Sequence, residues 1–209
     1  DRLLPLEGGG NEKNFRCGYE VKGDLEPLEL CKMLDRACNG RTAENAGVYK
    51  TLCGDPGLPV YFFTDEDIII TEPQTYNPFP GIEKIFNGVH ASYPEPAEAW
   101  SSKDAPPRYS SDLEEQDDGR RLIANLAFQA APYAIQVQRL MRAAIEANRR
   151  FRAHQAVFTP AVKLLEPLDV IAWTSARNGY INKKFMLGAI DDLNNVNQSA
   201  AFSEIDPTD

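Results

Sequence analysis

The two histidines of this chain are the side chains best suited to general acid–base chemistry. His90 and His154 lie far apart in the sequence, and each falls in a segment whose polar and apolar residues alternate as in a strand. The chain contains no GxSxG, HExxH, Walker A or GxGxxG motif. It therefore shows no nucleophile, base and orienting group at a recognised spacing, and we expect it not to be an enzyme.

Two groups of carboxylates could do chemistry of another kind. The acidic run 65–67, together with Glu72, could bind a cation, but it lacks the Asp-x-Asp-x-Asp-Gly spacing of a calcium loop. A glycosidase pair could be drawn from Glu95, Glu98, Glu114 and Glu115. Nothing in their polar, proline-rich surroundings would hold such a pair rigidly. We expect no catalytic carboxylates, no metal site and no cofactor.

The cysteines favour neither a disulfide nor a zinc site. Cys31 and Cys38 fall seven residues apart in a predicted helix, which places their Cα atoms about 10 Å apart, too far for a disulfide. Cys17 and Cys53 complete the set, and no CxxC pair is present. We expect buried, free thiols in a reducing compartment.

Composition limits the classes of partner. Hydrophobic residues make up 43% of the 209, which is enough for one large domain or two small ones. A net charge of −9 argues against a dedicated nucleic-acid binder, although five arginines between residues 139 and 152 cluster around the end of a predicted helix. No run of about 18 apolar residues is present, so we expect no membrane-spanning segment, and the first ten residues lack a signal-peptide pattern. The chain does not begin with Met, and we expect an excised piece of a larger protein.

The stretch 132–190 carries the strongest secondary-structure signal. Its first part predicts a helix over 132–149 with one apolar face, and the residues expected there are Val137, Leu140, Met141, Ala144 and Ile145. Gln136 is expected mostly on the solvent-facing side of this helix. A strand over 151–158 should follow, and then a hairpin from about Val170 to Leu187 that turns at Asn178-Gly179.

The rest of the chain predicts shorter elements. We expect a linker over 1–13, a strand over 15–21, a helix over 26–38, a hairpin of strands 47–53 and 59–63, a strand over 82–96, a long loop over 94–119, a strand over 120–130 and a connecting segment over 193–209. The loop is too long to be a plain connection in a compact domain. Trp100 and Tyr109 in it, with Tyr93 just before it, are candidate interface or receptor contacts. The alternative is that these rings pack on their own domain.

Several segments together resemble a known family. These are GDPGLPVYFFTDEDIII, FNGVHASYPEPAEAW, the loop with APPRY, the helix AIQVQRLMRAAIEANRR, and EPLDVIAWTSARNGYINKKF. They resemble, over about residues 15–192, the phage tail protein family found in tail-tip and host-specificity proteins of siphophages, prophages and gene transfer agents. Family members have a turn with the sequence Pro-Gly-Asp-Val-Val, which Pro167, Asp169, Val170 and Ile171 match. Leu168 stands where glycine is usual, which leaves the type of turn open.

The resemblance implies an α+β protein with a small α+β hub domain at 14–75 and a tail-tube-like β-barrel domain at 76–192 that carries the long helix. It implies a structural fragment of a baseplate hub, which closes the distal tail tube and links it to host-attachment parts. The partners would be other copies of the chain in a homotrimer and neighbouring distal tail and tube proteins. The place would be the virion tail, assembled in the bacterial host cytoplasm. Exposed aromatic residues leave open a carbohydrate- or receptor-binding module, and a cell-wall hydrolase is a third class.

Overall fold

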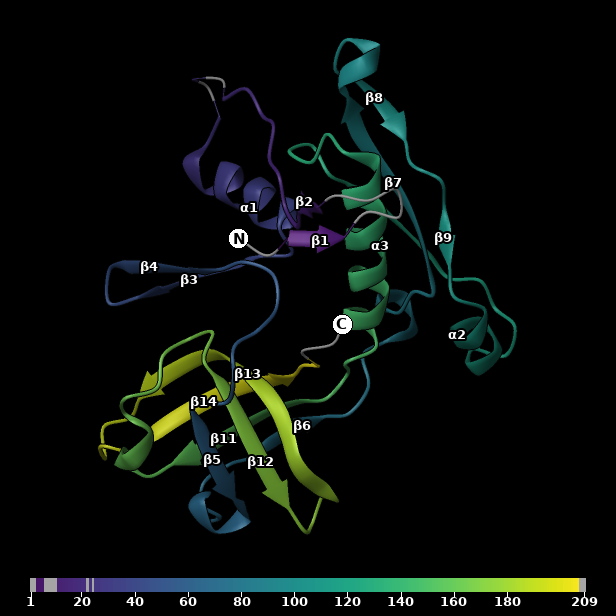
Figure 1. Cartoon of the computed structure of the whole chain (residues 1–209). Coiled ribbons are helices and arrows are strands. Elements are labelled where there is room, and N and C mark those ends of the chain that lie inside the picture. Colours follow the sequence, from purple (N-terminus) through teal and green to yellow (C-terminus); the bar gives the residue numbers. More distant parts are fainter. Residues whose placement is uncertain (1–2, 6–10, 22, 24, 207–209) are drawn as a thin grey trace. The chain divides into compact units, whose positions relative to one another are not determined.

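The computed structural model describes residues 3–5, 11–21, 23 and 25–206 (Figure 1). The fold is mixed α+β, with mostly sheets and few helices. The chain divides into two compact units, each made of two separate stretches of sequence. Unit 1 combines Asp1–Arg41 with Phe86–Glu146, and unit 2 combines Thr42–Ile85 with Ala147–Asp209. The domains expected at 14–75 and 76–192 follow the chain in order, whereas these units interleave.

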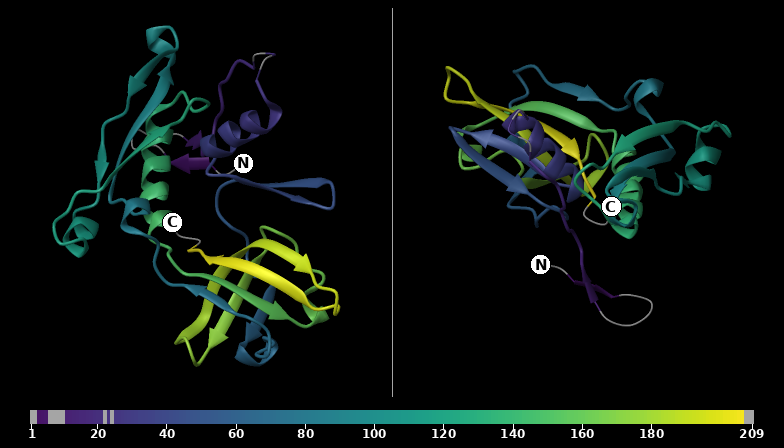
Figure 2. Two further views of the ribbon diagram at one scale, coloured as in Figure 1. Left: turned by 180° about the vertical axis from the view of Figure 1, so that it is seen from behind. Right: turned by 90° about the horizontal axis from the view of Figure 1, so that it is seen from above.

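Unit 1 is built on a small mixed sheet around one long strand. Its described elements are β1 (Leu3–Pro5), β2 (Asn11–Lys13), α1 (Pro27–Ala37), β7 (Gly88–Glu95), η3 (Pro96–Glu98), β8 (Ser101–Asp104), β9 (Arg108–Tyr109), α2 (Ser111–Gln116), β10 (Ile123–Ala127) and most of α3 (Ala134–Asn148). Strand β7 pairs parallel with β10 and antiparallel with β8 and β9. Strands β1 and β2 pair with each other. Helix α3 runs beside β7 in both Figure 1 and Figure 2.

Helix α3 matches the helix predicted over 132–149. Val137, Leu140, Met141 and Ile145 are buried, and they share a core cluster with Val89, Ala91 and Tyr93 of β7. The alternation predicted for β7 is therefore confirmed, since Val89 and Ala91 are buried and His90 is exposed. The prediction for Gln136 was wrong. Its side chain is 2% exposed, because it bonds to backbone groups of two other segments.

Helix α1 confirms the helix predicted over 26–38. Pro27 stands at its first turn, where the missing N–H costs nothing. The cysteines are free, as expected, but they are not buried: Cys17, Cys31 and Cys53 are exposed and Cys38 is half-buried. Only Ala37 of this helix is buried, so the helix turns its cysteines away from the core.

Unit 2 is a six-stranded sheet with a separate hairpin. Its described elements are β3 (Arg41–Asn45, of which Arg41 counts to unit 1), β4 (Val48–Leu52), β5 (Tyr61–Thr64), η1 (Asp65–Asp67), β6 (Thr75–Asn77), η2 (Ile82–Lys84), β11 (Ala153–Phe158), η4 (Pro160–Val162), β12 (Val170–Ser175), β13 (Tyr180–Asp192) and β14 (Gln198–Glu204). The strand order is β5-β12-β13-β14-β11-β6, and β3 pairs with β4. All pairs in the large sheet are antiparallel except β5 with β12.

Aromatic side chains fill the core of unit 2. Phe63, Phe158, Trp173, Phe185 and Phe202 are each 3% exposed or less and contact one another edge-on or face-on. The two ends of the hydrogen-bonded path are β5 and β6, while a single bridge joins Ile68, just after β5, to Phe158 of β11. The ladder of the described strands is therefore open, and the closed barrel stays a prediction.

Several local predictions were wrong, each for a structural reason. Residues 15–21 form no strand. All seven are half-buried or exposed, and the Gly18 N–H donates to the Ala130 carbonyl outside any ladder. Strands β4 and β5 do not form a hairpin with each other; β4 pairs with β3 and β5 with β12. The expected linker holds β1 and β2, the long loop holds β8, β9 and α2, and the connecting segment holds β14. The hairpin 170–187 is confirmed, with Gly179 at φ +69°.

The turn before β12 keeps a conformation that favours glycine. Leu168 has φ +72°, in the left-handed region where a Cβ costs about 1–2 kcal/mol. Its N–H donates to the Leu187 carbonyl at 2.8 Å, and the Leu187 N–H donates to the Asp169 carbonyl at 2.9 Å. The turn therefore holds Leu168 in a left-handed conformation although leucine carries a Cβ.

Candidate contact surface

The segment predicted as a long loop, residues 94–119, lies on unit 1 as an ordered arm. It continues β7 through a short turn into β8 and β9 and then into α2 (Figure 2, left). The turn is closed by the Trp100 N–H, which donates to the Glu95 carbonyl at 3.0 Å. The candidate contacts Trp100 and Tyr109 therefore stand on defined backbone.

Trp100 is exposed to solvent on a backbone of unusual conformation. Ala99 and Trp100 have φ values of +53° and +62°, so two consecutive residues with side chains occupy the left-handed region. The indole is 57% exposed. One of its edges lies 3.5 Å from the point where a Cβ on Gly18 would stand. Backbone strain of this kind tends to gather at functional positions, and here it presents a large aromatic ring.

A second exposed aromatic ring of unit 1 follows Pro132 in the chain. A Cβ on Gly18 would also lie 3.0 Å from the Pro132 side chain, so Gly18 sits between Pro132 and Trp100. The next residue, Tyr133, is 39% exposed, and the guanidinium of Arg16 lies 4.9 Å from its ring centroid. Tyr133 is therefore a second exposed aromatic ring of unit 1, with a cation against it.

The Tyr109 side chain packs against β7. Its ring covers Gly88, where a Cβ would come within 2.6 Å of the ring. Its hydroxyl lies 2.8 Å from Nε2 of His90, and the guanidinium of Arg121 lies 4.3 Å from the ring centroid. Glu114 holds Arg121 through two contacts, of 2.7 and 3.1 Å. The exposed part of Tyr109 is therefore a fixed polar-aromatic surface.

Tyr93 differs from the other two aromatic candidates. It is 4% exposed and belongs to the core of unit 1, which rules it out as a surface contact in this structure. Its hydroxyl donates to Glu95 at 2.8 Å. Burial raises the pKa of the Tyr93 phenol, and its hydrogen bond lowers the pKa of the Glu95 carboxyl. The sequence pattern could have indicated this, since Tyr93 shares the strand face of Val89 and Ala91.

Asn87 fixes the base of the arm, a role that was not predicted from the sequence. It is fully buried. Its side-chain amide donates to the Asp117 carboxylate at 2.8 Å and to the Arg120 carbonyl at 2.7 Å, and its Oδ1 accepts from the Leu122 N–H at 2.8 Å. The one signal in the sequence is a polar residue directly before β7, in the alternation that continues with the buried Val89 and Ala91.

Three of the four carboxylates considered for glycosidase chemistry each have a different partner. Glu95 accepts from Tyr93, Glu98 pairs with Lys103 at 2.6 Å and Glu114 pairs with Arg121. Glu115 makes no contact that bears on the surface. The geometry gives these groups structural roles in holding the arm.

The acidic run of unit 2 also serves the fold. Thr64 and Asp67 form a capping box around η1, in which Asp67 accepts from the Thr64 N–H at 2.7 Å. Asp65 accepts from the indole N–H of Trp173 at 3.2 Å. Across the part of the chain that the structure describes, no group of three or more His, Cys, Asp or Glu side chains is placed to hold a metal ion.

His154 lies inside the aromatic core of unit 2. It is 8% exposed, its ring stacks with those of Tyr76 and Phe202, and its Nε2 lies 3.1 Å from the Tyr180 hydroxyl. Burial, reinforced by the positive charge of Arg152, lowers its pKa to about 4. The imidazole is therefore neutral at physiological pH and acts as a packed ring.

The charged neighbours of His154 form a paired cluster. The Glu204 side chain is 9% exposed, and its carboxylate lies 2.6 Å from Nζ of Lys183 and 3.2 Å from Nη1 of Arg152. Burial alone would raise the pKa of Glu204, but these two cations lower it below its ordinary value. Two cations thus share one carboxylate beside His154.

The helices of the described chain are too short or too polar to cross a bilayer. Compared by sequence alone, the chain matches no described protein family and no characterised protein.

Comparison of structures does find similar folds. The fold is similar to a protein of the virion of a native gene transfer agent particle, with a TM-score of 0.74 at 15% identity, over 98% of this chain and 44% of that one. It is also similar to the 43 kDa tail protein of prophage MuSo2 from Shewanella oneidensis, with a TM-score of 0.53 at 12% identity, over 90% of this chain and 55% of that one. The chain thus spans about half the length of these proteins. The resemblance to phage tail proteins expected from the sequence is confirmed at the level of the fold.

Proposed function

We propose that this chain is part of a structural protein of a phage-like tail, a fragment of a baseplate hub that closes the distal end of the tail tube. The likeness that supports the proposal most is the one to the gene transfer agent virion, because it covers 98% of the chain. The hub would consist of three copies, with unit 2 contributing a tail-tube-like barrel. Its neighbours would be distal tail and tube proteins and the parts that attach to the host.

The side chains of the described residues favour a structural role over catalysis. The candidate catalytic carboxylates hold the arm of unit 1, and His154 is packed in an aromatic core. A ring subunit needs broad rigid surfaces and strand edges that can pair across copies. The free edges of β5, β6 and β10 are of that kind. The net charge of −9 would also discourage DNA from adhering to a tube wall.

Deletion of the parent gene in its source strain tests this function. We expect particles with no tail or with an unfinished tail tip under the electron microscope, and complementation with the intact parent gene should restore them. Complementation with a parent carrying Ile135→Ser, a change at an exposed side chain of α3, is the matched control and should restore tails as well. Normal tails in the deletion strain would contradict a structural role.

Trp100 favours a second candidate, a carbohydrate- or receptor-binding module. A strained backbone exposes its indole, and aromatic rings of this kind are common platforms for sugars. Glycan-array binding that is lost in Trp100→Ala and kept in Ile181→Ala would support this function. No binding of the unaltered chain to host envelope glycans would count against it.

A further inference from the structure

The sheet of unit 1 ends in a free polypeptide edge. In a parallel pair, the backbone groups of alternate residues face the neighbouring strand. The Leu122 carbonyl and the Phe128 N–H bond to β7, so the register directs Ala124 and Leu126 toward β7 as well. The N–H and C=O groups of Ile123, Asn125 and Ala127 therefore face the other way, where no described strand pairs with them.

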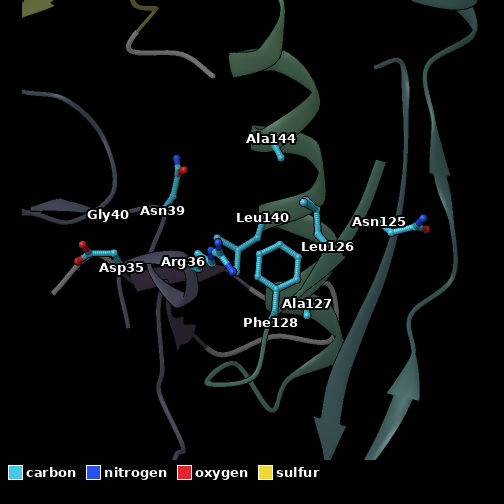
Figure 3. Close-up of a pocket in the computed structure, with 10 residues that line it drawn as sticks. All are labelled: Asp35, Arg36, Asn39, Gly40, Asn125, Leu126, Ala127, Phe128, Leu140 and Ala144. Carbon is cyan, nitrogen blue, oxygen red and sulfur yellow. The ribbon is translucent and has the colours of Figure 1, made fainter. Parts of the chain in front are cut away.

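A pocket of about 330 Å³ opens beside this same edge (Figure 3). Leu126 and Phe128 of the β10 segment and Leu140 and Ala144 of α3 supply its apolar lining. Asp35 and Arg36, at the end of α1, contribute polar groups. A pocket that is partly apolar and adjoins a row of unpaired backbone groups fits an extended peptide strand that also carries a bulky apolar side chain.

Unit 2 presents a strand with the matching features. Strand β5 is one end of the six-stranded ladder. It pairs with β12 on one side, and no described strand pairs with its other side. Leu58, Val60 and Phe62 are 85%, 62% and 64% exposed. They lie on β5 and on the segment that leads into it, which bends at Val60, and we call these three exposed apolar side chains the β5 stripe.

We propose that β5 of one copy of this chain adds to the β10 edge of a second copy, with Phe62 entering the pocket beside β10. Each copy then offers two different surfaces, the β5 stripe and the β10 pocket. A contact of this heterologous kind runs head to tail and builds a ring when the rotation closes. The proposal deepens the hub function and rests on it for the ring, whereas the pairing itself is a property of the chain alone.

Two variants disable the two surfaces separately. Phe62→Ser removes the ring from the stripe, and Ala144→Trp fills the pocket. Each should weaken self-association of the chain, measured by analytical ultracentrifugation, by about tenfold to a hundredfold, since each removes the burial of one aromatic side chain. The matched controls are Ile181→Ser and Ile135→Ser, which alter exposed apolar side chains of β13 and α3 outside both surfaces. They should associate like the unaltered chain.

Mixing the two variants, each of which lacks one of the two surfaces, is the decisive part of the experiment. The Phe62→Ser chain keeps an intact pocket and the Ala144→Trp chain keeps an intact stripe, so an equimolar mixture should form mixed dimers although neither variant associates alone. Hydrogen exchange should show protection of the Asn125 and Ala127 amides in the dimer. Circular dichroism and thermal melting of each variant confirm that it is folded before mixing, and Ala144→Phe replaces Ala144→Trp if the tryptophan unfolds the chain.

Three results would overturn the pairing. They are an unaltered chain that stays monomeric at every concentration that solubility allows, a mixture that stays monomeric, and a dimer whose Asn125 and Ala127 amides exchange freely. The first includes the case in which β10 is covered within one molecule. All three leave the hub function to be decided by the gene deletion, so the two ideas fail separately.

Discussion

The imidazole of His154 lies flat against the ring of Tyr76, with 4.4 Å between the ring centroids and 11° between the planes. This stack joins β11 to the end strand β6 of the open ladder. The neutral form of His154 is therefore part of the packing that holds β6 in place.

Acid should destabilise unit 2 through His154. Its folded pKa, about 4, lies below the ordinary value of 6.5, so the unfolded chain binds the proton first as the pH falls. The stabilisation is complete above pH 6.5 and is lost between pH 6.5 and 4. The free energy of unfolding should fall by roughly 2 kcal/mol from pH 7 to pH 5. Arg152, Arg177 and Lys183 oppose protonation and Glu204 favours it.

The measurement is urea denaturation followed by Trp173 fluorescence, in a Trp100→Phe background so that only unit 2 reports. His154→Phe should remove most of the fall between pH 7 and pH 5. An equally steep fall in that variant would assign the pH dependence to other groups.

Glu204 should matter to stability far more than an exposed acid. Replacing it with glutamine leaves Lys183 and Arg152 without their shared counter-ion at a side chain that is only 9% exposed, and we expect a cost of about 2 kcal/mol. Glu98→Gln, which breaks the exposed pair with Lys103, is the control and should have little effect. Denaturation of both variants at pH 7 decides the matter. Equal effects would mean that the cluster contributes no more than a surface ion pair.

The turn at Leu168 should invert the usual ranking of alanine and glycine. Because φ is +72°, Leu168→Ala loses apolar packing and keeps the strain, whereas Leu168→Gly loses the packing and relieves the strain. The free energy of unfolding of the glycine variant should exceed that of the alanine variant by about 1 kcal/mol. Thermal and urea denaturation of the pair give the comparison. An alanine variant that is the more stable of the two would show that the positive φ stores no strain.

Gln136 should be a costly residue to remove. Its side chain accepts from the Arg16 N–H at 2.9 Å and donates to the Arg16 carbonyl at 2.9 Å and the Ala37 carbonyl at 2.7 Å. Gln136→Leu leaves these buried backbone groups unpaired and should cost about 2–4 kcal/mol. Gln138→Leu is the control and should cost less than about 1 kcal/mol. Faster hydrogen exchange at Arg16 in the first variant only is the expected sign, and unchanged exchange there would show that water replaces the side chain.

The sequence predicted the elements whose periodicity is unbroken. Helix α3 and the β12–β13 hairpin were found because apolar spacing and the Asn178-Gly179 turn both report on local backbone. Strand β14 was missed because QSAAFSE carries few β-branched residues and is defined by pairing on both sides with β13 and β11. The partner of β5 was missed for the same reason, since parallel pairing joins residues that are far apart in the chain.

The candidate contacts were predicted in part. Exposed positions for Trp100 and Tyr109 followed from their polar surroundings, whereas the burial of Tyr93 required the strand register of β7. Gln136 was misjudged because helical periodicity treats a glutamine as solvent-facing, and its real partners, Arg16 and Ala37, come from distant segments. The pocket beside β10 likewise forms only when α1, β10 and α3 come together.

The central claim, a hub position in a phage-like tail, is tested most directly by cryo-electron microscopy of the distal tail end in intact particles of the source strain. We expect the structures of unit 1 and unit 2 each to fit three symmetry-related densities in a ring that closes the tube. Density at the distal end that fits neither unit, in particles shown by mass spectrometry to contain the parent protein, would contradict it.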